Sequence, residues 1–185
     1  MEIREYAERV LLGATLEEKL AIPSVVLTDR RPGVAMLAPD KPGRPDDLQF
    51  RKQGERSPMP SVTELADDGD RGRLLHFFGN HELLAAELMA LVLLRFPEAP
   101  AEFRRGVAET LREEQTHTRL YMRRMEACGV SFGSQPVNGF FWRVVSTMQT
   151  PVDYVARLSL TFEQANLDYA KHFAGVFKRA GDTAT

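Results

Sequence analysis

Hydrophobic residues recur every three or four positions through most of this chain, which is the pattern of amphipathic α-helices. Residues 3–12 place their apolar side chains on one face and are followed by Gly13, so they predict a short helix. Thr15 and Glu18 have the spacing of a capping box and predict the start of a second short helix.

Three longer helices are predicted further along the chain. The first runs from about residue 70 to 96 and is stopped by Pro97. The second, at residues 100–128, follows after so short a turn that it must pack antiparallel to the first. A connection that holds a short helix at 138–149 leads to the third, at 151–180.

Residues 31–60 differ from the rest because proline and glycine interrupt every periodic pattern. The segment nevertheless contains apolar residues, so we expect an extended arm that lies over the bundle and buries them: Val34, Met36, Leu37, Leu48 and Phe50. The sequence thus predicts an all-α protein with an N-terminal arm at 1–60 and a helical bundle at 61–185.

Composition narrows the class of protein. With 185 residues, of which 43% are hydrophobic, the chain can form one domain, or one domain and an arm. A net charge of −2 gives no reason to expect a nucleic acid or an anionic membrane as partner. No stretch approaches the roughly 20 apolar, uncharged residues of a membrane span. Cys128 is the only cysteine, which favours a cytoplasmic location.

Candidate metal ligands lie near the middle of each long helix. Glu114 and His117 are three positions apart, so they project from one face of their helix. In a helical bundle such a pair can bind a metal, with a glutamate of a neighbouring helix bridging to a second metal. Glu82 and Glu163 are the mid-helix glutamates of the other two helices.

These residues lie at similar depths, roughly 18–21 Å from the starts of their helices. Their helix faces are otherwise apolar, where a carboxylate is costly unless it is paired or bound to a metal. We therefore expect the donor atoms of Glu82, Glu114, His117 and Glu163 to lie within about 6 Å of one another.

Glu87 is the rival of Glu82 on the first long helix. Five positions on a helix differ by about 140°, so both cannot face the same metal. Reflecting Glu114 about the turn at 98–99 favours Glu82 and leaves Glu87 as a surface or interhelical salt-bridge residue. His117 taken alone would more often be an interior histidine than a ligand, but its position one turn from Glu114 in the middle of the bundle favours a ligand.

Other polar residues of the bundle have simpler interpretations. We expect Glu113 to be solvated and His76, His81 and Tyr121 to serve in packing or hydrogen bonding. His172 lies too far along the third long helix to share the layer of the ligands.

Several stretches carry a family resemblance: Arg4–Leu11, Leu16–Leu20, His81–Leu88, Glu113–His117 and Leu160–Asp168. In these stretches the chain resembles the ferritin-like superfamily of non-haem dimetal-carboxylate proteins. More narrowly, it resembles an uncharacterised domain-of-unknown-function family within that superfamily.

The resemblance implies a four-helix bundle with six protein ligands, of which this sequence carries four. Residues 181–183 look like the stop and cap that precede a fourth helix, which is then either truncated or supplied by a partner chain. Without it, the faces that carry Leu84, Met89, Leu111 and Leu167 should not all be covered within one chain. We therefore expect a homo-oligomer.

The function expected on these grounds is that of a non-haem di-iron, or iron/manganese, oxidase or oxygenase. It would act with dioxygen on an unknown small organic substrate. Glu114 and Glu163 would bridge two ions, while Glu82 and His117 would be terminal ligands. The alternatives are an iron-oxidising or metal-sequestering protein without organic substrate, and an inert helical scaffold whose carboxylates pair with arginines.

Overall fold

The computed structural model of the protein describes residues 1–52, 65, 67–158 and 164–182, with backbone only for 164–170. Within these ranges the regular structure is helical, without a β-strand, so the all-α prediction is confirmed; the ferritin-like connectivity stays a prediction. The elements are α1 (Ile3–Leu12), α2 (Leu16–Leu20), the 3-10 helix η1 (Asp46–Leu48), α3 (Asp68–Arg95), α4 (Ala101–Ala127), α5 (Phe140–Val145), α6 (Pro151–Tyr154) and α7 (Gln164–Arg179).

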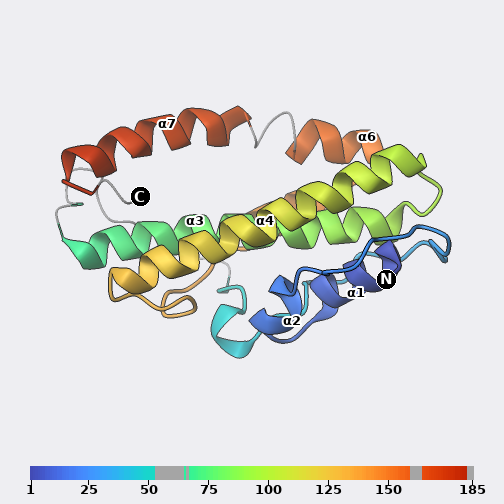
Figure 1. The fold of residues 1–185 in the computed structure, drawn as a ribbon, viewed down its shortest axis with the longest axis horizontal. Helices are drawn as coiled ribbons and strands as arrows, with labels where there is room; N and C mark the ends of the chain where they lie inside the picture. Colours follow the sequence, from blue (N-terminus) through green and yellow to red (C-terminus); the bar gives the residue numbers. More distant parts are fainter. Residues whose placement is uncertain (53–64, 66, 159–163, 183–185) are drawn as a thin grey trace.

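The long helices α3 and α4 form the antiparallel hairpin that the short turn predicts (Figure 1). α6 and α7 run along one side of this pair, and α1 and α2 lie on the opposite side. Two parts of the expected helix at 151–180 are described: α6 with the π-helical turns that follow it at 155–158, and α7 from residue 164. Residues 159–163, and Glu163 with them, lie outside the described residues.

Side-chain caps fix the starts of several helices. The Thr15 hydroxyl accepts from the backbone N–H of Glu18, completing the predicted capping box of α2. A second capping box, between Thr150 and Asp153, opens α6. Asp67 caps α3 by accepting from the N–H of Gly69 at 2.7 Å, so this helix begins slightly earlier than the sequence indicated.

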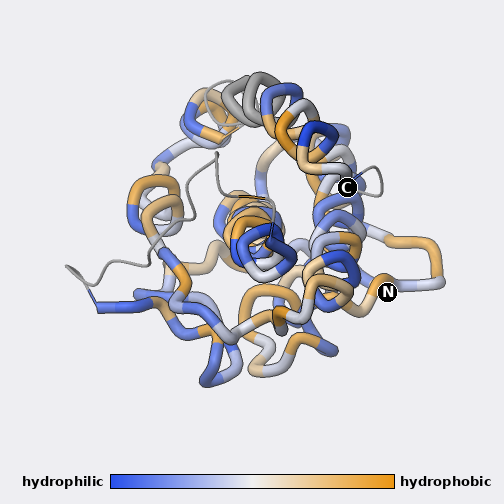
Figure 2. The backbone as a smooth tube through the Cα atoms, turned by 90° about the vertical axis from the view of Figure 1, so that its left-hand side faces the viewer, coloured by the Kyte–Doolittle hydropathy of each residue, from blue (hydrophilic) through white to orange (hydrophobic). Residues whose placement is uncertain are grey.

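α3 is the central helix of the core. Seen along the long axis, a mainly hydrophobic helix lies in the middle of the molecule with other elements around it (Figure 2). α3 is long and apolar enough to cross a membrane, contrary to the sequence-based expectation, but 72% of its apolar window is buried inside the protein. That burial is typical of the core helix of a soluble protein.

The sequence predicted an open apolar groove on the bundle, but the described residues that were expected to line it are buried. The side chains of Leu84, Met89 and Leu111 are buried within the single chain, whereas that of Leu167 lies outside the description. α1 packs against α3 and brings its own apolar face into the core that contains these side chains, and Tyr154 of α6 belongs to the same core. The expected homo-oligomer therefore stays a prediction that these side chains do not support.

The arm buries fewer of its apolar residues than expected. Leu48 is buried, and Met36 and Phe50 pack against the core, but Val34 and Leu37 are 80% and 87% exposed. Backbone contacts hold this segment instead: the Val34 carbonyl accepts from the Arg4 guanidinium, and the Met36 N–H donates to Leu94.

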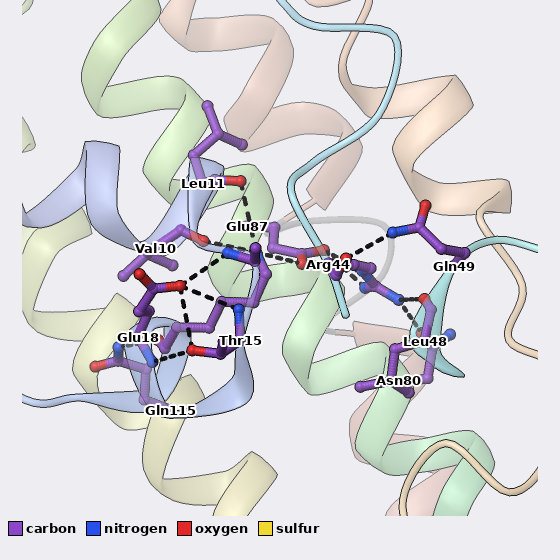
Figure 3. A network of polar contacts seen from close by, with 12 residues as sticks. Val10, Leu11, Thr15, Glu18, Arg44, Leu48, Gln49, Asn80, Glu87 and Gln115 are labelled. Carbon is purple, nitrogen blue, oxygen red and sulfur yellow. Dashed lines mark hydrogen bonds and ion pairs between the residues drawn. The ribbon is translucent and has the colours of Figure 1, made fainter. Parts of the chain in front are cut away.

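A buried ionic network joins the arm to α3 (Figure 3). Glu87 is fully buried and accepts three hydrogen bonds from the Arg44 guanidinium, with Nη2 2.7 Å from Oε2. The Lys19 ammonium, also fully buried, lies 2.9 Å from the other carboxylate oxygen and donates to the Val10 carbonyl. Arg44 further donates to Asn80 on α3. One carboxylate thus holds α2 and the arm against the central helix.

Replacing Glu87 with glutamine should destabilise the protein by about 3–5 kcal/mol, because Lys19 and Arg44 would stay buried without an anion. Urea unfolding at neutral pH measures this change. The exposed substitution Glu109→Gln on α4 is the control and should alter stability by no more than about 0.5 kcal/mol. A loss below about 1 kcal/mol for Glu87→Gln would mean that the charge of Glu87 is not what holds the arm.

His76 on α3 should make stability depend on pH. Burial lowers the pKa of His76 to about 4, and its Nε2 accepts from the Gly133 N–H at 3.0 Å. As pH falls below about 6.5, the unfolded chain takes up this proton before the folded one does, so stability falls until about pH 4. His76→Gln should reduce that slope by up to about 1.4 kcal/mol per pH unit. Urea unfolding at pH 7.0 and 5.0 tests this, and equal slopes in both proteins would contradict it.

Candidate metal centre

The hairpin of α3 and α4 brings together Glu82, Glu114 and His117. Each residue offers one ligand atom, and these atoms all lie within 4.8 Å of one another. The convergence expected of these three residues is therefore present, although their role as metal ligands stays a prediction. The fourth candidate, Glu163, lies outside the described residues.

The cluster has an inner and an outer side. The side chains of Glu82 and Glu114 are 17% and 8% exposed, whereas that of His117 is 51% exposed. The imidazole Nδ1 lies 3.4 Å from Oε2 of Glu82 and 3.3 Å from Oε2 of Glu114. Two carboxylates thus lie inward, and the histidine stands at the mouth of the site.

Electrostatics link the three groups. Burial pushes the pKa of Glu82 upward, but hydrogen bonds with His117 and Glu114 and the charges of two histidines outweigh it, so this pKa lies below its ordinary value. Two ionised carboxylates that share a site repel each other, and a bound cation would neutralise that repulsion.

The donor set fits a transition-metal ion. Neighbouring ligands of an octahedral ion with bonds of about 2.1 Å lie roughly 3.0 Å apart, and opposite ligands roughly 4.2 Å apart. The separations of 3.3 and 3.4 Å, with all three atoms inside 4.8 Å, need only small side-chain adjustments to match. The residues present are thus compatible with a shared ion.

Glu87 does not belong to the cluster. It lies on the side of α3 that faces the arm and is engaged by Lys19 and Arg44. The expectation that Glu87 is a salt-bridge residue is therefore confirmed, with the difference that the bridge is buried rather than on the surface.

Sequence reasoning missed the two cations that hold Glu87. A signal for Lys19 was present, because it shares a face of α2 with Leu16 and sits beside Leu20, so an inward lysine could have been expected. Arg44 gave no such signal, since it lies in the proline-rich arm, 43 positions before Glu87.

The remaining polar residues behave largely as expected. His81 packs its ring against Phe77 and Phe141, and burial lowers the pKa of His81 to about 4. Tyr121 packs beside Phe78, and burial raises the pKa of Tyr121 to about 12. These contacts support packing roles for both.

The fold and the cluster define a class: an all-α protein whose central helical hairpin carries a Glu–Glu–His group able to hold a metal ion. The chain belongs to the family described as "Protein of unknown function (DUF455)", whose sequence profile matches residues 6–185. The match supports an uncharacterised family, and the expected place of that family in the ferritin-like superfamily stays a prediction. No curated protein and no solved structure matches the chain.

Removing one carboxylate charge from the cluster should not destabilise the metal-free protein. Glu82 and Glu114 repel each other, so Glu114→Gln measured in chelator should leave stability unchanged or raise it. Thermal unfolding of both proteins in chelator measures the effect, with Glu109→Gln as the exposed control on the same helix. A loss of several kcal/mol, as predicted for Glu87→Gln, would instead identify Glu114 as part of a structural ion pair.

Proposed function

We propose that this protein is a ferritin-like metal-binding protein that holds iron, or iron and manganese, at Glu82, Glu114 and His117, with Glu163 as a further ligand. The observation that carries the proposal is the convergence of three ligand atoms within 4.8 Å between two antiparallel helices. Two ions are expected in a complete bundle of this type.

The ligand chemistry supports iron or manganese over zinc. Structural zinc sites favour cysteine and histidine, whereas carboxylates with a single imidazole suit ions that accept oxygen-rich coordination. Such ions, when bound, would supply redox chemistry with dioxygen. The inward carboxylates of Glu82 and Glu114 would balance the positive charge, and His117 would orient toward the same ion from the mouth of the site.

An oxidase or oxygenase acting on a small organic substrate is the function that we favour. The side chains beside the cluster include Met89, Phe103 and Val107, which form an apolar wall next to Glu114 and His117. Such a wall excludes water and can hold an organic molecule. The competing candidate is a metal-oxidising or sequestering protein without organic substrate, favoured by the half-exposed His117, which leaves a path for ions from solvent.

Metal analysis of matched variants tests the proposal. Protein loaded anaerobically with Fe(II), or with Mn(II), and then desalted should retain metal, and Glu82→Gln, Glu114→Gln and His117→Ala should each lose at least about tenfold in affinity. The control Glu109→Gln should retain the wild-type content. Metal retained equally by all five proteins, or by none, would refute the proposed site.

A further inference from the structure

A cleft of about 510 Å³ opens beside the cluster, with Glu114 and His117 among its lining residues. Its apolar wall is formed by Met89, Phe103, Val107, Tyr154 and Val155, and the rings of Phe103 and Tyr154 meet edge to face. The volume lies within the range of roughly 300–1,000 Å³ that is typical of small-molecule sites. The cleft therefore adjoins the proposed metal site and could hold a molecule against it.

Gly106 keeps one side of this cleft clear. It lies inside α4, where glycine weakens a helix relative to alanine. A Cβ added at Gly106 would meet no atom of the described residues within 4 Å, so helix packing in this part of the chain does not require the glycine. Gly106 lowers the stability of α4 and is not required by packing. We therefore attribute its presence to the space that the missing side chain leaves in the cleft.

The opposite side of the cleft departs from regular helix. Val155, a lining residue, is the first residue of the π-helical turns that follow α6. Such turns interrupt helices rarely and occur frequently at functional sites. Two independent irregularities, a glycine in α4 and π-helical turns after α6, thus face the same cleft.

The charged side chains that line the cleft determine which ligand charge is favoured there. Among the described lining residues the acidic groups are Glu113 and Glu114, and neither lysine nor arginine is present. A metal ion would offset the charge of Glu114, but Glu113 is exposed and its carboxylate would remain at the rim. An anionic ligand would be repelled there, whereas an ammonium group would be attracted.

Resting on the proposed metal site, we infer that this cleft binds the organic substrate, a small molecule with an apolar body and an ammonium group that faces Glu113. The apolar body lies against Met89, Phe103 and Val107, and the hydroxyl of Thr110, which donates to the Gly106 carbonyl, lines the same side. The class of substrate is therefore an apolar amine rather than a carboxylic acid or a phosphate ester.

Three probes that share one apolar body test the inference: 4-phenylbutylamine, 4-phenylbutan-1-ol and 4-phenylbutanoate. Calorimetric titration of the Mn(II)-loaded protein should give the tightest binding for the amine and at least about fivefold weaker binding for the carboxylate. Glu113→Gln should weaken binding of the amine by about two- to fivefold and leave the affinity for the alcohol unchanged. Equal affinity for amine and carboxylate would overturn the inference.

A second variant locates the ligand. Gly106→Leu fills the cleft from a position where a larger side chain has room, so the protein should fold and retain metal while amine binding falls at least about tenfold. Ala101→Leu, at the exposed start of the same helix, is the control and should bind the amine normally. Unchanged amine binding in Gly106→Leu would overturn the assignment to this cleft.

The failure of the substrate site can be distinguished from the failure of the metal site. Metal retention without amine binding would refute the cleft as a site for amines and leave the proposed metal site standing. Amine binding in chelator that is lost in Gly106→Leu, together with absence of metal from the wild type, would refute the proposed function and keep the ligand site. Carboxylate binding that depends on Arg112, which lines a neighbouring cleft that shares Glu113 and His117, would overturn the inference.

Discussion

The buried charge of Glu87 is the constraint on which the arrangement of the two central helices depends. A fully buried carboxylate must be paired, and here Lys19 and Arg44 supply two cations from the N-terminal segment. Because these cations approach from the side of the arm, α3 can take only the rotation that turns Glu87 toward them. Five positions along a helix correspond to about 140°, so the same rotation turns Glu82 away from the arm and toward α4.

The same segment also fixes α4. Gln115, which is fully buried, accepts a hydrogen bond from the Tyr6 hydroxyl at 2.6 Å and donates to the Lys19 carbonyl at 2.5 Å. With Gln115 turned toward α1 and α2, its neighbour Glu114 is rotated by about 100° and reaches the side of Glu82. Lys19 therefore contacts both long helices, through its ammonium group and through its carbonyl, and sets the register in which the cluster forms.

The parts of this architecture that could be predicted from the sequence are those that depend on local patterns. The hairpin followed from Pro97 and the brief turn, and Glu82 was preferred over Glu87 because a hairpin reflects positions about its turn. The pairing of Lys19 and Arg44 with Glu87 could not be predicted, because a contact between distant segments produces no repeating pattern in the sequence. For the same reason the sequence predicted α1 as part of an arm, although its apolar face shares one core with that of α3.

The two glutamates of α3 differ in the positive charge that the protein places beside each carboxylate. At Glu87 one negative charge meets two protein cations, and the guanidinium and ammonium donors fill its oxygen atoms. At Glu82 the charged partners among the described residues include a second carboxylate and a half-exposed imidazole, so the protein supplies less positive charge there than at Glu87. Glu87 is fully buried and the side chain of Glu82 is only 17% exposed, so each carboxylate loses most of its hydration and needs positive charge nearby. A divalent cation bound by Glu82, Glu114 and His117 would provide for the cluster the charge balance that Lys19 and Arg44 provide for Glu87.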